Sequence, residues 1–171
     1  MAASVMRGLL LAGTLSWFGG DVAANTCDPW QYTDEGGTAG GSHEAYLRCH
    51  GEVRLMLICH LGDTGVIYAS EGAMDETVPY DEKNRLRFDF SSGSFEADAS
   101  LDGWLGWYFP LGHIRDGLRP SHPFVAAVRQ NAEVTVSGSR GAPRETYPLR
   151  GSSGAIDQMF DQCRQHMEEL N

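Results

Sequence analysis

Residues 85–102, RLRFDFSSGSFEADASLD, carry the clearest periodic pattern in the chain. Apolar residues occupy every second position on both sides of the central SSGS, and mainly charged residues lie between them. Side chains of a β-strand alternate between its two faces, so each half is typical of a strand with one buried face. Glycine and serine between the halves favour a turn. The stretch therefore predicts an antiparallel β-hairpin.

Further strand patterns lie on both sides of this hairpin. They are WQYT at 30–33, AYLRC at 45–49, VRLMLICHL at 53–61, VIYAS at 66–70, AEVTVSG at 132–138 and ETYPLRG at 145–151. A short helix is predicted near Pro123, with Phe124 and Val128 on its buried side. After residue 151, apolar residues recur at helical spacing. We therefore expect a mainly β fold, either an antiparallel sheet or a small β-sandwich, closed by a C-terminal helix.

The N-terminus has the pattern of an export signal. Gly8 to Phe18 is apolar, and Val22-Ala23-Ala24 offers small residues for cleavage. The apolar stretch is shorter than the roughly 20 residues that a transmembrane helix needs. We predict a secretory signal peptide over 1–24, an N-terminal strand and Gly-rich flexible segment over 25–44, and a single β-rich domain over 45–171. The expected location is the bacterial periplasm or the medium, with no transmembrane segment.

The formal net charge is −10 at pH 7. Such a surface repels phosphate backbones and anionic lipids, which argues against nucleic acid and membrane surfaces as partners.

Four cysteines follow the predicted signal, and an even number in an oxidising compartment favours two disulfides. Cys59 shares a strand face with Leu55 and Leu57, and Cys163 lies on the apolar stripe of the last helix. This favours a Cys59–Cys163 disulfide and, by subtraction, Cys27–Cys49. Cys49–Cys163 is the main alternative, because Cys49 also lies in a predicted strand.

The corner at 151–155, GSSGA, invites comparison with the nucleophilic serine of hydrolases. The hydrolase motif is G-x-S-x-G in a parallel α/β sheet, whereas this glycine comes one position early and the sheet is predicted to be antiparallel. We therefore expect Ser152 or Ser153 to cap the following helix, and we assign no catalytic residue.

Metal and cofactor sites were considered at Cys49-His50 and Cys59-His60, because thiolate and imidazole bind zinc and copper. Neighbouring residues of a strand point to opposite faces, so neither pair can easily hold one ion. We predict no metal site and no cofactor. The histidines at 43, 113, 122 and 166 are expected to be exposed or hydrogen-bonded.

Trp104, Trp107, Tyr108 and Phe109 form the one aromatic cluster that suggests binding. Glycines interrupt it and a proline ends it, so it is less regular than a buried strand. Some of these rings are expected to fill the core. Any ring left at the surface would suit a protein partner or a sugar, and these four residues are the partner-binding candidates.

The order of segments resembles the small exported bacterial proteins of the VasI type, which are associated with type VI secretion. The resemblance rests on VPYDEKNRLRFDF, DGWLGWYFP and AEVTVSG, and on a closing strand and helix that match at Tyr147, Leu149, Gly151, Ala155 and Cys163. It covers about the last 90 residues. The helix here runs past Cys163, and the first half carries extra cysteines. The resemblance implies an exported β-rich accessory protein and no catalytic residues.

Three functions follow as hypotheses. The first is a non-enzymatic periplasmic binding or accessory protein that acts through protein–protein contacts in a secretion or envelope system. The second is an inhibitor or immunity-type protein that blocks an envelope-targeting enzyme such as lysozyme, since YLRCHGEVRLMLIC at 46–59 resembles the Cys-bearing hairpin of periplasmic lysozyme inhibitors. The third is a hydrolase, for which no motif is present.

Overall fold

The computed structural model describes residues 26–35, 42–69, 83–102, 106–116, 120–138 and 144–170. The predicted signal peptide, residues 36–41 of the Gly-rich segment and Trp104 lie outside these ranges.

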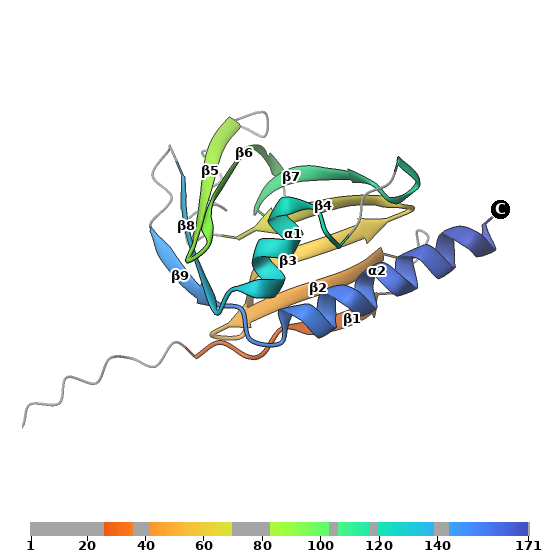
Figure 1. The fold of residues 1–171 in the computed structure, drawn as a ribbon, viewed down its shortest axis with the longest axis horizontal. Coiled ribbons are helices and arrows are strands. Elements are labelled where there is room, and N and C mark those ends of the chain that lie inside the picture. Colours follow the sequence, from red (N-terminus) through yellow and green to blue (C-terminus); the bar gives the residue numbers. More distant parts are fainter. Residues whose placement is uncertain are drawn as a thin grey trace, which may run out of the picture.

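Within them the chain forms one nine-stranded antiparallel sheet, so the first of the two predicted β architectures is confirmed (Figure 1). The strands are β1 (Gln31–Glu35), β2 (Ser42–Cys49), β3 (Glu52–His60), β4 (Asp63–Tyr68), β5 (Lys83–Phe90), β6 (Gly93–Asp102), β7 (Gly106–His113), β8 (Glu133–Gly138) and β9 (Glu145–Pro148). Their spatial order is β1-β2-β3-β4-β7-β6-β5-β8-β9. The meander β5-β6-β7 is therefore inserted in reverse between β4 and β8.

The predicted hairpin at 85–102 is β5 and β6, with Phe88 opposite Phe95 in the register. Leu86 and Phe88 are fully buried, whereas Arg85 and Arg87 are exposed and bind Glu96 on the outer face. The alternation of apolar and charged residues in the sequence therefore corresponds to the buried and exposed faces of the sheet.

Two α-helices cover the inner face of the curved sheet (Figure 1). The longer helix, α2 (Ser152–Glu169), packs on β1, β2 and β3. The shorter helix, α1 (Pro123–Gln130), inserts Phe124 among phenylalanines of β5, β6 and β7. Arg129 of α1 donates two hydrogen bonds to the Asp157 carboxylate of α2, at 2.7 and 2.8 Å, which joins the helices. A short 3₁₀ helix, η1 (Ile114–Asp116), follows β7.

Both predicted disulfides are present, and the Cys49–Cys163 alternative is excluded. Cys59 and Cys163 face each other between β3 and α2, and both are buried in the core. Cys27 and Cys49 join the segment before β1 to the end of β2. The disulfides thus fasten the two ends of the described chain to the sheet.

Candidate functional site

The serines of the 151–155 corner are structural, but the predicted capping role is wrong. Gly151 occupies the N-cap of α2, and no side chain caps this helix. Instead Ser152 donates a hydrogen bond to the Val128 carbonyl at 2.8 Å, and Ser153 donates to the Arg129 carbonyl at 2.9 Å. Helix C-termini leave carbonyls without partners, so these serines satisfy the end of α1 instead of the start of α2.

Two rings of the aromatic stretch lie in the core, which is the first of the two positions expected for them. Trp107 and Phe109 are only 5% and 2% exposed, because both point into the core from β7. Tyr108, on the other face, is half-buried, with its ring close to Gly65. Trp104 lies outside the described residues. Burial removes Trp107 and Phe109 as partner-binding residues and leaves Tyr108 partly accessible.

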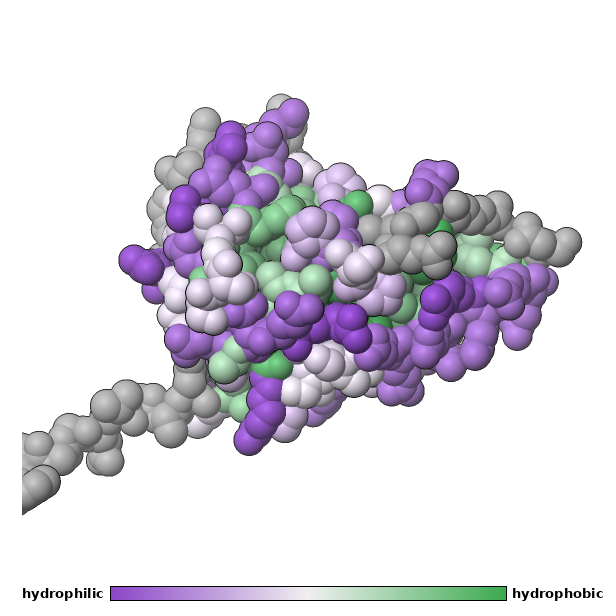
Figure 2. Space-filling view, in the orientation of Figure 1, coloured by the Kyte–Doolittle hydropathy of each residue, from purple (hydrophilic) through white to green (hydrophobic). Residues whose placement is uncertain are grey.

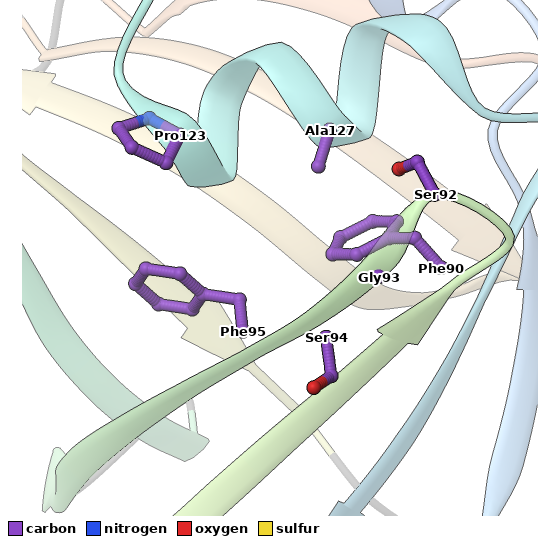
Figure 3. A pocket seen from close by; sticks show the side chains of 7 residues that line it. All are labelled: Phe90, Ser92, Gly93, Ser94, Phe95, Pro123 and Ala127. Atoms are coloured by element: carbon purple, nitrogen blue, oxygen red, sulfur yellow. The ribbon is translucent and has the colours of Figure 1, made fainter.

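The structure instead shows a shallow hollow between the β5–β6 turn and α1 (Figure 3). Its volume is about 180 Å³. It is lined by Phe90, Ser92, Gly93, Ser94, Phe95, Pro123 and Ala127. Small-molecule sites usually enclose roughly 300–1,000 Å³, so this hollow suits a single side chain better than a whole substrate. We call it the α1 hollow.

Rigid aromatic packing supports the floor of the α1 hollow. Phe95 lies in the floor, and its ring centre is 5.1 Å from that of buried Phe124. Phe124 in turn packs on Phe88 at 5.0 Å and on Phe109 at 5.4 Å. In the space-filling view, apolar surface is visible where α1 meets this hairpin, with hydrophilic residues around it (Figure 2). The apolar floor is therefore the exposed end of the core.

Asn131, directly after α1, fixes the rim of the α1 hollow. Its side-chain oxygen accepts hydrogen bonds from the Ser91 hydroxyl at 2.6 Å and from the Ser92 amide at 3.2 Å. Its side-chain nitrogen donates to the Ser92 hydroxyl at 3.0 Å and to the Ala127 carbonyl at 2.8 Å. Asn131 thus joins the β5–β6 turn to the end of α1 through hydrogen bonds that it both donates and accepts. These hydrogen bonds hold the rim in the arrangement that forms the hollow.

A second polar cluster joins β4 to β9 across the inside of the sheet. Tyr68 donates a hydrogen bond to Glu145 at 2.8 Å, and Tyr147 donates to the same carboxylate oxygen. Burial, together with the neighbouring Tyr147 and Glu145, raises the pKa of Tyr68 well above its ordinary value. Burial and the Glu145 hydrogen bond raise the pKa of Tyr147 as well. Both phenols stay protonated at neutral pH, so the cluster acts as a structural tie between distant strands.

Two of the histidines expected to be exposed or hydrogen-bonded lie against each other. His43 of β2 and His166 of α2 lie together, with ring centres 5.8 Å apart. Burial lowers the pKa of His43, with Asp34 opposing the shift and His166 adding to it. The two residues are 123 positions apart in the sequence, so no local pattern indicates their contact. Among the described residues, no three His, Cys, Asp or Glu side chains converge as a metal-binding group.

Comparison of the chain with protein-family models, with curated proteins and with solved structures gave no match. Two disulfides are the mark of a protein that matures outside the reducing cytoplasm. None of the helices in the described part of the chain has both the length and the apolar character required to span a membrane.

Proposed function

We propose that this protein is an exported, periplasmic binding protein that acts without catalysis, by receiving an apolar side chain of a basic protein partner in the α1 hollow. The observation that carries the proposal is the hollow itself: an apolar floor of Phe90 and Phe95 beneath a rim of serine hydroxyls. Protein interfaces gain most of their affinity where a large side chain fills such a pocket.

The rigidity of the site supports this function. Asn131 holds the rim, and phenylalanines in tilted and edge-to-face contact hold the floor, so a partner meets a preformed surface. A preformed surface loses little conformational freedom on binding, which increases affinity for a given contact area. The Ser92 hydroxyl at the rim accepts a hydrogen bond from Asn131 and can donate one to the partner's backbone beside the inserted side chain.

The charge of the chain indicates the chemistry of the partner. A net charge of −10 attracts basic proteins and accelerates their encounter, with an effect that salt weakens. The resemblance to VasI-type proteins supports a partner from a secretion or envelope system.

The test is capture of proteins from the envelope of the source cell by the immobilised, oxidised protein. Ala127→Phe fills the α1 hollow from its helical wall. Ala126→Phe is the matched control, because Ala126 is the preceding residue of α1, is half-exposed and does not line the hollow. We expect a basic protein that the wild type and Ala126→Phe retain, that Ala127→Phe loses, and whose retention falls as salt increases.

Retention of the same proteins by Ala127→Phe would contradict the proposal. So would an absence of retained protein together with release of product from peptidoglycan or a simple ester by the purified protein. If the retained partner is an enzyme, an activity assay on that enzyme separates an accessory protein from an inhibitor: a fall in its activity on binding identifies the inhibitor.

A further inference from the structure

The contact between His43 and His166 has features that the fold does not need. His43 lies on the inner face of β2, directly opposite Cys59 in the register, and is 5% exposed. His166 follows Cys163 by one helical turn on α2. The Cys59–Cys163 disulfide therefore joins α2, which carries His166, to β3, the strand that pairs with the His43 strand. His43 is buried and His166 is half-buried, and the backbone of each is held by these contacts.

Each imidazole keeps one nitrogen without a partner. The Nε2 atoms of His43 and His166 are both buried, and neither has a hydrogen-bond partner among the described residues. Buried polar atoms are usually hydrogen-bonded, and each exception requires an explanation. Two such atoms on neighbouring rings point to a missing group that would satisfy both at once.

The other nitrogen of His43 is already engaged. Its Nδ1 lies 3.0 Å from the Tyr32 hydroxyl and 3.8 Å from the Asp34 carboxylate, both on β1. Histidines that bind metals usually donate this second N–H to a carboxylate or another acceptor, which orients the ring and directs the free lone pair at the ion. Tyr32 and Asp34 lie where such supporting groups are expected. The Asp34 carboxylate favours a proton on Nδ1, and in that tautomer the Tyr32 oxygen accepts from Nδ1 and the lone pair is on Nε2.

The distance between the rings fits a shared ion. A metal–imidazole bond is about 2 Å long, which places each ring centre about 3.1 Å from the ion; two rings that share one ion through Nε2 therefore have centres about 6.2 Å apart when the arrangement is linear, and closer when it is bent. The observed separation is 5.8 Å, and the ring planes are inclined by 69°.

We propose that His43 and His166 bind one Cu⁺ ion, with Tyr32 and Asp34 as supporting groups. Zn²⁺ usually takes four ligands in a structural site, whereas no third His, Cys, Asp or Glu joins the pair in the described part of the chain. Cu⁺ can be held by only two ligands, and imidazole is among the protein ligands of copper. The proposal is independent of the α1 hollow, with which the site shares no residue.

The test is titration of the purified, oxidised protein with Cu⁺ under anaerobic conditions, in competition with the chelator bicinchoninate. We expect one Cu⁺ per chain. His43→Gln and His166→Gln, which keep the side-chain volume nearly constant, should each weaken binding at least about 100-fold, and Asp34→Asn should weaken it about 10-fold. His60→Gln is the matched control, because His60 is exposed on the neighbouring position of β3, and its affinity should stay within about twofold of the wild type.

A measurement on the wild type keeps the test valid if a buried variant fails to fold. Cu⁺ is diamagnetic, so histidine ring nitrogens can be followed by NMR during the titration. The Nε2 signals of His43 and His166 should move together and saturate at one equivalent. Movement of other histidine signals alone, unchanged affinity in both variants, or binding of Zn²⁺ without Cu⁺ would each overturn the proposal.

Discussion

Removal of the two disulfides, one pair at a time, should destabilise the protein by different amounts. The double substitution Cys59→Ala/Cys163→Ala opens a loop with a sequence separation of 104. Cys27→Ala/Cys49→Ala opens one with a separation of 22. A disulfide restricts the unfolded chain more when it closes a longer loop, so the first pair should contribute more to the free energy of unfolding.

The loop-closure relation gives the magnitudes. At 25 °C it yields about 4.8 kcal/mol for the Cys59–Cys163 loop and about 3.4 kcal/mol for the Cys27–Cys49 loop. The difference, about 1.4 kcal/mol, is a tenfold change in the folding equilibrium. The loops do not overlap in the sequence, so removal of both disulfides should cost the sum, about 8 kcal/mol, which is comparable with the whole stability of many domains.

The assay is urea unfolding at pH 7, followed by circular dichroism and by tryptophan fluorescence. Both double variants should unfold at lower urea, and the slope against denaturant should increase because the unfolded chain expands. The ratio of the two losses is the decisive quantity. If the Cys27–Cys49 variant lost as much stability as the Cys59–Cys163 variant, loop closure would not be the main effect of these bonds.

Three other predictions test the packing. The pKa values of Tyr68 and Tyr147 are higher in the folded protein, so the unfolded chain loses its phenol protons at lower pH. The free energy of unfolding should therefore fall above about pH 10, by up to roughly 2.7 kcal/mol per pH unit for the two groups together. In urea unfolding at a series of pH values, Tyr68→Phe/Tyr147→Phe should remove most of this fall. Ser152→Ala removes the hydrogen bond to the Val128 carbonyl and should cost about 1 kcal/mol by the same unfolding assay, and an unchanged midpoint would refute this role. Gly106→Ala should lower the free energy of unfolding by at least about 2 kcal/mol, because the φ of Gly106 is +120° and a Cβ there would lie 2.4 Å from the Tyr68 carbonyl oxygen. A thermal melt of this variant like that of the wild type would contradict the clash.

The parts of the fold that local patterns encode could be predicted from the sequence. The alternation from Leu86 to Leu101 indicated a hairpin, because burial of one sheet face imposes a period of two on the residues. The faces of Cys59 and Cys163 indicated their pairing for the same reason. Which side chains are buried depends here on the regular spacing of residues within one strand or helix, so the periodicity of the sequence predicts it.

The rest depends on contacts between distant segments. The partner of Ser152 is a carbonyl 24 residues earlier, so a rule for local helix caps assigned it to the wrong helix. The glycines around Trp107 suggested an irregular exposed strand, but Gly106 adopts a positive φ that lets β7 approach β4 closely. The α1 hollow and the histidine pair arise only when separate elements pack together, and no motif in the chain marks either one.

The connectivity of the disulfides has a consequence for maturation. In the export that we propose, a chain that crosses the membrane from its N-terminus presents Cys27 and Cys49 first, then Cys59, and Cys163 last. The native bonds join the first cysteine to the second and the third to the fourth. An oxidant that pairs cysteines in the order in which they emerge therefore produces the native bonds directly. Oxidative folding of this protein should need a thiol oxidase but no isomerase to exchange wrongly paired sulfurs.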